Sequence, residues 1–421
     1  MKTMIRNRWL PILLFAFVAL TAGQSSAAVQ GIQGSMFNLN AEPGYITTGD
    51  GESLLFWGYN DLDGAIGVQY PGPTLLLMEG DTVTINLTND LPENVSLVFP
   101  GQDNVTVSGG VPGLLTSEAT PGGSVSYTFT ATHAGTYTYY SGTHADLQVE
   151  MGLVGAIVVY PGSMDRAYDH AATAFDREFL FLLTEMASGI HYDVEFDGPT
   201  GVDTTGYFPD LWFINGRAAP DTMSDPYVGW LPAQPYNCMP MMHPGETLLL
   251  RFVGAGRNAH PFHHHANNAT AIAIDGRLLE STPGAGPDLG VSDFTQTIYP
   301  GETEDALFTW SGAGLGWDIY GHDAGDPLEP GEDPQDHGKP FPVLLPEQQE
   351  TAFGEDWSGS PFLGQFGPLP PGQGIGNLNG GYFFMWHSHA EKEMVNNDIF
   401  PGGMMTMLII EHPDVPIMEM Q

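Results

Sequence analysis

Short apolar segments recur along the chain between polar, glycine-rich connections. They cover residues 82–87, 124–129, 136–140 and 153–160 in the first half, and residues 246–253, 270–274, 303–310, 382–387 and 404–410 in the second. Each segment is rich in β-branched or aromatic residues and is bounded by Gly, Pro or Asp, which is typical of short strands joined by turns. The pattern predicts an all-β protein, and the high content of Gly (54) and Pro (34) argues against a helical bundle.

The predicted strands form an internal repeat. Four segments in the first half match four in the second, and the pairs begin at Glu79 and Pro244, Pro121 and Pro300, Gly135 and Gly381, and Gly152 and Gly402. The third pair, for example, reads GTYTYYSGTH and GYFFMWHSHA. Because each copy has the strand content of one Greek-key β-sandwich, we expect two such domains, at residues 29–162 and 163–421, joined near residues 162–177.

The second repeat contains an insertion at about residues 311–380 that the first repeat lacks. The insertion is far longer than an ordinary loop and is rich in Gly, Pro and Asp. It is either a lid or partner surface, or a segment partly without fixed structure, and the sequence leaves both alternatives open.

The first 28 residues have the pattern of a bacterial Sec-type signal peptide. A basic segment at residues 2–8 precedes an apolar run at residues 10–20, and the Ser-Ala-Ala of residues 26–28 suits a signal peptidase. The apolar run is too short to cross a bilayer. We therefore expect cleavage after about Ala28 and a secreted or periplasmic protein with no membrane span.

The chain is strongly acidic, with a formal net charge of −39 from 50 acidic and 11 basic residues. This charge makes nucleic acid and anionic membrane surfaces poor partners. The acidic residues are dispersed along the sequence, which favours solubility in a salty medium over attraction of cations.

Cys238 is the only cysteine, so the chain has no internal disulfide, and we expect the thiol to be buried or to bind a metal. It opens the segment CMPMMH, which ends at His243. Thiol, thioether and imidazole groups together suit Cu(I), but methionines are also common fillers of hydrophobic cores. We favour the interpretation that the methionines of this segment fill the hydrophobic core.

Two histidine pairs are the strongest chemical signal. His263 and His265 are two residues apart, so on a strand they share one face while His264 points to the other. His387 and His389 repeat this spacing on a second predicted strand. Two such pairs in one sandwich present four imidazoles to a single site, and imidazole suits copper, zinc, iron and nickel.

Three segments resemble the multicopper oxidase superfamily, which includes laccases and copper nitrite reductases. They are PGPTLLLMEGDTVTINLTNDLP from Pro71, HPFHHHA from His260 and MWHSHAEKE from Met385. The resemblance extends over nearly the whole mature chain outside the insertion, and it implies two cupredoxin-like domains. In that family four H-x-H pairs hold three coppers. A cysteine between the last two histidines and two further histidines hold a blue type 1 copper.

The chain departs from the family pattern at the first two H-x-H pairs and at the type 1 site. Residues 98–100 and 140–142 stand where the first two H-x-H pairs are expected, so the N-terminal domain lacks these four histidines. Ser388 occupies the position of the type 1 cysteine, and Glu393 that of the second type 1 histidine. Because a hydroxyl cannot replace a thiolate as a soft ligand, we expect neither a blue site nor standard laccase activity.

His260 is the remaining histidine of the type 1 set, and the resemblance implies that it is a metal ligand, with Met404 as an axial group. His144 is either a further ligand or an ordinary loop histidine. Glu391 and Glu393 are weaker candidates for ligands, partners of imidazole N–H groups or catalytic proton carriers, and are otherwise solvated charges.

We therefore expect one or two copper ions rather than the full set of four. They are held by the paired histidines, and the main hypothesis is an exported copper-dependent oxidoreductase with a non-blue site. Its electron donor would be a small phenol, a metal ion or a nitrogen oxide. The alternatives are a non-catalytic copper protein for storage, tolerance or delivery, and a cell-surface structural protein with a vestigial site. The resemblance also implies a homo-oligomer, often a trimer with sites at subunit interfaces.

Overall fold

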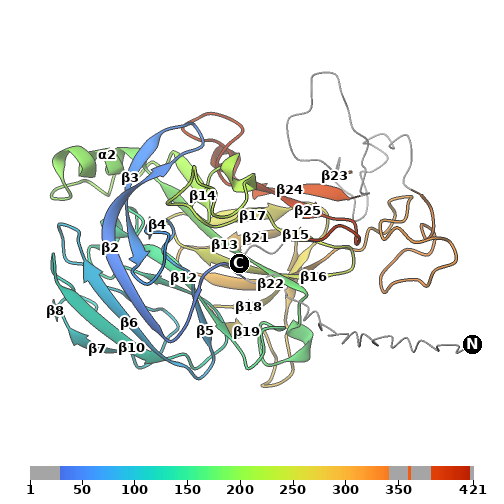
Figure 1. Ribbon diagram of the computed structural model, residues 1–421, viewed down its shortest axis with the longest axis horizontal. Coiled ribbons are helices and arrows are strands. Elements are labelled where there is room, and N and C mark those ends of the chain that lie inside the picture. The colour runs from blue at the N-terminus through green and yellow to red at the C-terminus, as the bar shows by residue number, and fades with distance from the viewer. Residues whose placement is uncertain (1–28, 341–358, 362–380, 418–421) are drawn as a thin grey trace, which may run out of the picture.

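The computed structural model describes residues 29–340, 359–361 and 381–417 of the 421-residue chain. Strands dominate these residues, and helices are few and short (Figure 1), so the prediction of an all-β protein is confirmed. The expected signal peptide and much of the expected insertion lie outside the described residues. None of the helices in the described part of the chain has the length and apolar character needed to cross a membrane.

The strands up to residue 160 form two facing sheets. One has the order β1-β5-β12-β11 and the other the order β4-β3-β2-β6-β10-β7, and β8 pairs with β9. Their bounds are β1 Ile32–Gln33, β2 Met36–Thr47, β3 Ser53–Asp61, β4 Val68–Gln69, β5 Leu75–Met78, β6 Thr82–Asn89, β7 Thr106–Gly109, β8 Val111–Pro112, β9 Ser117–Glu118, β10 Ser124–Thr130, β11 Gly135–Tyr140 and β12 Val154–Tyr160. Strand β6 shows why the sheet has two faces, because Val83, Ile85 and Leu87 are buried in alternation with more exposed polar residues.

The strands from residue 177 onward form a second pair of sheets. One has the order β14-β13-β16-β22-β18-β19 with β20 on β18, and the other the order β15-β25-β24-β17-β21 with β23 on β24. Their bounds are β13 Arg177–Met186, β14 Leu211–Ile214, β15 Met241–Met242, β16 Thr247–Gly254, β17 His260–His264, β18 Ala269–Ile274, β19 Arg277–Leu278, β20 Val291–Asp293, β21 Thr295–Ile298, β22 Thr303–Thr309, β23 Gly359–Pro361, β24 Tyr382–Ser388 and β25 Met405–Ile410. The helical elements are α1 Ala145–Gln148, α2 Ser188–Asp197, η1 Ala171–Thr173, η2 Asp221–Met223 and η5 Glu391–Met394.

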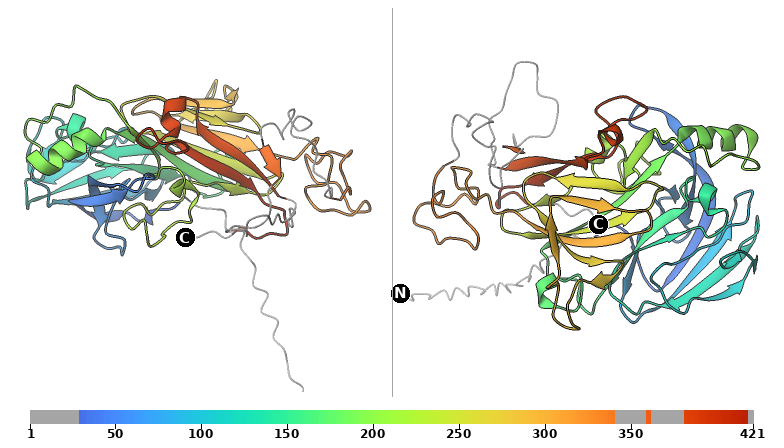
Figure 2. Two further views of the ribbon diagram at one scale, coloured as in Figure 1. Left: turned by 90° about the horizontal axis from the view of Figure 1, so that it is seen from above. Right: turned by 180° about the vertical axis from the view of Figure 1, so that it is seen from behind.

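The two pairs of sheets lie side by side, with the blue and cyan strands at one end of the molecule and the yellow to red strands at the other (Figure 2). Between the C-terminal sheets, Phe181 of β13 packs on Phe262 of β17 and Trp386 of β24, with ring centroids 5.0 and 6.1 Å apart. Burying such aromatic side chains stabilises the fold by roughly 2–3 kcal/mol each. This packing fixes the inward faces of β17 and β24, and therefore also which residues face outward.

Candidate metal centre

The candidate centre lies on two neighbouring strands of the C-terminal six-stranded sheet. Strands β17 and β24 are antiparallel, and their register places His263 opposite His387. Phe262 points into the core, so His263 and, two residues on, His265 lie on the other face. Strand pairing and strand parity together bring three imidazoles into one place.

The separations within this histidine cluster fit a single metal ion. The ligand atoms of His263, His265 and His387 all lie within 4.8 Å of one another. Nε2 of His265 is 3.3 Å from Nε2 of His387, close to the ~3.3 Å between two nitrogens that bind one ion at about 2.0 Å in a tetrahedral arrangement. His389 lies at the edge of the cluster, with its ring centroid 5.0 Å from that of His263 and its side chain 54% exposed.

Backbone carbonyls orient two of the three rings. Nδ1 of His263 lies 2.8 Å from the carbonyl oxygen of Phe294, and Nδ1 of His387 lies 2.7 Å from that of Ser388. A carbonyl oxygen only accepts, so each Nδ1 carries a proton and donates it, and in the neutral ring each Nε2 keeps its lone pair. Such hydrogen bonds fix ring orientation and tautomer in metal sites.

The electrostatic surroundings keep these rings uncharged. Burial, reinforced by the neighbouring His265 and His387, lowers the pKa of His263 to about 4, and burial also lowers the pKa of His387. A neutral imidazole can bind a metal ion through its lone pair, whereas a protonated one cannot. The donor set therefore fits copper, one of the metals that imidazole suits.

His264 belongs to the hydrophobic core, as its position on the opposite face of β17 predicts. Its ring centroid lies 5.6 Å from that of Trp386 and 6.2 Å from that of Phe308. Burial lowers its pKa to about 4, so the ring is neutral at ordinary pH.

His260 is not brought to the histidine cluster. It shares the face of β17 that carries Phe262, where Nε2 donates to Glu185 and Nδ1 donates to Glu393, both at 2.9 Å. Burial opposes a charge on the ring, but the hydrogen bonds to Glu185 and Glu393 raise the pKa of His260 to about 9. His260 is thus an imidazolium between two carboxylates, and the ligand set that we propose leaves it out.

Glu185 is a member of this buried group that sequence reasoning missed. It lies on β13, 75 residues before its partner His260, and no local motif marks it. Its other oxygen accepts hydrogen bonds from the backbone N–H groups of Arg257 and Asn258, at 2.6 and 2.9 Å. A Cβ atom at residue 256 would lie 1.9 Å from the Glu185 carboxylate, so only Gly256 allows this close approach.

The raised pKa of His260 predicts a pH-dependent stability. A raised folded-state pKa adds stability that is complete below the unfolded value of about 6.5 and is lost as the pH rises through about 9. We expect the His260 contribution, on the order of 3 kcal/mol, to disappear across this window. Urea unfolding at several pH values measures it, and the difference in stability between wild type and His260→Gln should narrow from pH 6.5 to above 9. A difference independent of pH would contradict the charged state of His260.

The remaining sequence candidates lie outside the histidine cluster. Glu391 is exposed and its carboxylate is 3.4 Å from Nδ1 of His389, at the edge of the cluster. His144 precedes α1 in the N-terminal half and lies 3.1 Å from Glu93. The described residues that group with the cluster's ligand atoms do not include His144, Glu391 or Glu393.

Residues 98–100 and 140–142, where the resemblance implies the first two H-x-H pairs, take part in ordinary strand pairing and core packing. Val98 and Tyr140 form an antiparallel bridge, with the Val98 N–H 2.9 Å from the Tyr140 carbonyl. Ser141 is buried and its hydroxyl donates to the side chain of Gln148. These positions of the N-terminal sandwich therefore bring no imidazole to the C-terminal cluster.

Comparison with known proteins gives matches to one superfamily. A family model described as multicopper oxidase matches residues 55–164. The chain is 43% identical over 98 residues to a multicopper oxidase of Talaromyces pinophilus, a match covering 23% of this chain and 16% of that protein. It is 36% identical over 237 residues to copper resistance protein A of Escherichia coli, covering 50% of this chain and 38% of that protein. The matches thus span less than two fifths of either relative.

Solved structures give the same fold. The crystal structure of a blue copper oxidase from Nitrosomonas europaea superposes with a TM-score of 0.57 at 20% identity, covering 89% of this chain and 85% of that one. Two adjacent β-sandwiches of this type, the second carrying a histidine cluster, define a cupredoxin-fold protein with a candidate metal centre. The family model and the curated relatives place the matched parts of the chain in the multicopper oxidase superfamily, as its sequence motifs predict.

Proposed function

We propose that the protein is an exported copper-dependent oxidoreductase that uses a non-blue, histidine-ligated site. His263, His265 and His387 hold one or two copper ions, and His389 lies at the edge of the site. The supporting observation is the convergence of three imidazoles, with Nε2 of His265 and Nε2 of His387 3.3 Å apart. When bound, copper supplies one-electron redox chemistry.

Two features support a non-blue site. Ser388 offers a hydroxyl where the superfamily has its type 1 cysteine, and His260 is held between Glu185 and Glu393. Cys238 supplies no substitute thiolate, because it is fully buried and its thiol donates to the carbonyl of Ile214 at 2.9 Å. Burial raises the pKa of Cys238 to about 12, which keeps it protonated.

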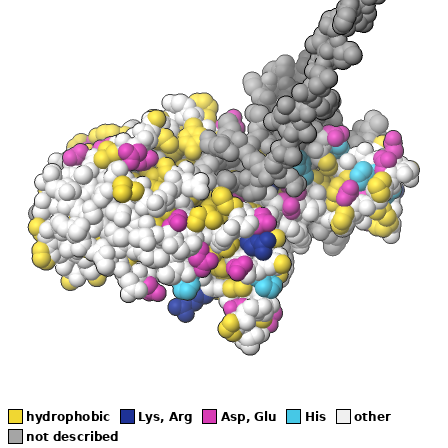
Figure 3. All heavy atoms as spheres, turned by 60° about the horizontal axis from the view of Figure 1, so that its bottom comes forward, with side chains coloured by type: hydrophobic (Ala, Val, Ile, Leu, Met, Phe, Trp, Pro, Cys, Tyr) yellow, Lys and Arg dark blue, Asp and Glu magenta, His cyan; other side chains and the backbone are white. Residues whose placement is uncertain are grey.

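The open edge of the cluster supports inner-sphere chemistry with a small donor. His389 is half-exposed, and Glu391 beside it is positioned to accept or release a proton at the solvent boundary. We expect a small phenol, a metal ion or a nitrogen oxide as the donor. Asp and Glu side chains are scattered over the face of the molecule drawn in Figure 3, which favours general solubility and offers a donor no single docking patch.

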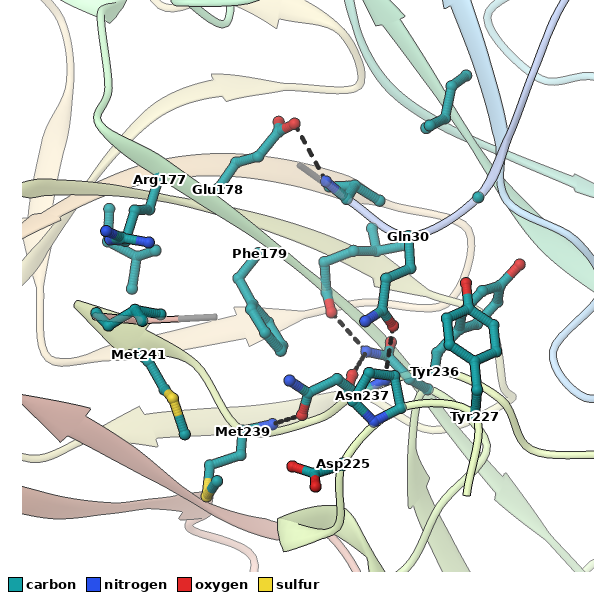
Figure 4. Close-up of a pocket in the computed structure, with 18 of the residues that line it drawn as sticks. Gln30, Arg177, Glu178, Phe179, Asp225, Tyr227, Tyr236, Asn237, Met239 and Met241 are labelled. Carbon is teal, nitrogen blue, oxygen red and sulfur yellow. Dashed lines mark hydrogen bonds between the residues drawn. The ribbon is translucent and has the colours of Figure 1, made fainter. Parts of the chain in front are cut away.

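A non-catalytic copper-binding protein is the second candidate, and one cavity favours it. Figure 4 shows Met239 and Met241 on the wall of a cavity of about 450 Å³, which Met164 also lines. Thioether sulfurs suit Cu(I), so this cavity offers the soft ligands that a storage or delivery protein needs. Cys238 does not contribute to it, because its thiol faces Ile214.

Copper loading of the mature protein tests the proposal. We expect one or two copper ions per chain, a type 2 electron paramagnetic resonance spectrum, no intense thiolate-to-copper band in the visible, and consumption of oxygen or nitrite with at least one donor. An intense visible band or failure to retain copper would contradict the proposed site. Copper retention without turnover across phenols, reduced metal ions and nitrogen oxides would favour the storage or delivery function.

The proposal includes a homo-oligomer, because the three grouped imidazoles leave room for a ligand from a neighbouring copy. Sedimentation of the copper-loaded protein tests the expected trimer. His144→Ala would weaken copper binding only if the trimer brings that histidine to a neighbour's cluster.

A further inference from the structure

A second group of potential metal ligands lies outside the histidine cluster, in the described part of the insertion. Residues 311–340 contain no helix or strand and project from the end of the C-terminal sandwich, on the right in Figure 1. The start of the segment is anchored by Leu315, Trp317 and Ile319, which pack into the core. Beyond residue 320 no residue of the segment belongs to a hydrophobic cluster of the described chain, and Leu328 is exposed. Apolar burial therefore does not explain how this part keeps its shape.

Charged and imidazole groups fill the interior of the segment instead. Ligand atoms of Asp318, His322, Glu332 and His337 all lie within 4.8 Å of one another. Nδ1 of His337 is 2.6 Å from Glu332 Oε1 and 3.8 Å from Asp318 Oδ2. Nδ1 of His322 is 3.2 Å from Glu332 Oε2 and 3.7 Å from Asp318 Oδ2. The Asp318 and Glu332 side chains are only 1% and 2% exposed, so both carboxylates are withdrawn from water.

The hydrogen bonds of His337 show that a positive charge is needed between these groups. Its Nε2 lies 3.0 Å from the carbonyl oxygen of Asp326, which can only accept, so Nε2 carries the proton. In a neutral ring, Nδ1 then directs its lone pair at the carboxylates of Glu332 and Asp318. Two buried carboxylates that face such a lone pair are stable only with a cation or a second proton between them.

His322 completes the group from the other side. Its Nδ1 is buried and faces both carboxylates, yet it lacks the alignment of a hydrogen bond to either. Nδ1 of His322 and the two carboxylates thus face one common point, as the ligands of a metal ion do. The ring of His322 also stacks on Tyr320, with an interplanar angle of 12°, which restricts its rotation.

Backbone groups hold both carboxylates in place. Asp318 accepts from the N–H groups of Tyr320 at 2.9 Å and Gly338 at 2.8 Å, and Glu332 accepts from that of Glu329 at 2.8 Å. Hydrogen bonds of this kind orient metal-binding side chains and are part of a built site rather than of a chance group of acids.

We propose that Asp318, His322, Glu332 and His337 form a structural site for a divalent transition-metal ion of the zinc type. The bound ion cross-links residues 318–322 to residues 332–337 and so stabilises the projecting segment. Two imidazole nitrogens and two carboxylate oxygens form a closed set of four protein ligands, as structural zinc sites have. One divalent cation balances the two carboxylates when both rings are neutral. The site is separate from the copper-binding cluster and does not rest on the proposed oxidoreductase function.

Zinc binding by the full-length chain tests this site. In a His263→Ala/His387→Ala background, which removes the first cluster, we expect one zinc ion per chain by metal analysis after dialysis. Adding His322→Ala/His337→Ala should weaken zinc binding at least about 100-fold. Asp323→Asn is the matched control, because it removes an exposed acid of the same segment that is outside the ligand group, and it should leave the affinity unchanged.

Limited proteolysis tests the structural role. At free zinc about 100 times its dissociation constant, mass action should slow cleavage within residues 311–340 about 100-fold, and the His322→Ala/His337→Ala variant should lose this protection. Three results would overturn the proposal. The first is that no zinc is bound, the second is that Asp323→Asn lowers zinc affinity as much as the histidine substitutions do, and the third is that zinc does not change the rate of cleavage. The first would mark the group as a protonated histidine–carboxylate cluster, the second would mark it as a diffuse cation attractor, and the third would remove the structural role.

Discussion

The His387→Ala variant is expected to bind copper at least about 100-fold more weakly than the wild type and to lose the proposed oxidoreductase activity. His387 is one of the three grouped histidines, with Nδ1 fixed by the Ser388 carbonyl and Nε2 3.3 Å from that of His265. Losing a direct ligand should cost more than the 10–100-fold that follows from losing a partner of a ligand. Copper titration against a competing chelator, followed by electron paramagnetic resonance, measures the loss.

The control for this variant is His133→Ala, which removes an exposed histidine outside the cluster. It should leave both copper affinity and turnover unchanged. Because His387 is buried, near-ultraviolet circular dichroism must show that the variant keeps its tertiary packing. A folded His387→Ala protein with unaltered copper affinity would remove the basis of the proposed site.

The alternation of side chains between the two faces of a strand allowed much of the histidine cluster to be predicted from the sequence. The two-residue spacing of His263 and His265 placed them on one face of β17, and the internal repeat predicted the partner strand that carries His387. The same parity argument assigns His260 to the core face with Phe262 and His264. The expectation that His260 binds a metal came from the family resemblance, and the structure instead places it between two carboxylates.

The parts that sequence reasoning missed depend on contacts without a local pattern. Glu185 reaches His260 only because β13 and β17 lie in facing sheets of one sandwich, and no periodicity links residues so far apart. His322 and His337 had no assigned role, since their segment has neither strand nor helix spacing. Irregular segments place side chains through turns and backbone hydrogen bonds, which pattern analysis does not predict.

Arg251→Met is expected to lower the free energy of unfolding by about 3–5 kcal/mol. Arg251 is fully buried on β16, where its Nε donates to Glu178 at 2.7 Å and its Nη1 lies 3.5 Å from Asp305. Nη1 also lies 3.1 Å from the hydroxyl of Thr136, on β11 of the N-terminal sandwich. Removing the guanidinium leaves two buried carboxylates without their cation at the contact between the two sandwiches, and burial penalises such charges strongly.

The exposed pair of Arg166 and Asp165, 3.1 Å apart, provides the matched control. Its side chains remain in contact with water, which screens their charges, so Arg166→Met should change stability far less than Arg251→Met. Urea unfolding at pH 7, followed by both tryptophan fluorescence and circular dichroism, compares the two variants. A similar small loss in both would mean that water or protonation of Glu178 and Asp305 relieves the buried charges. A large loss confined to Arg251→Met would show that this cation stabilises the contact between the sandwiches, since its partners come from β11, β13 and β22.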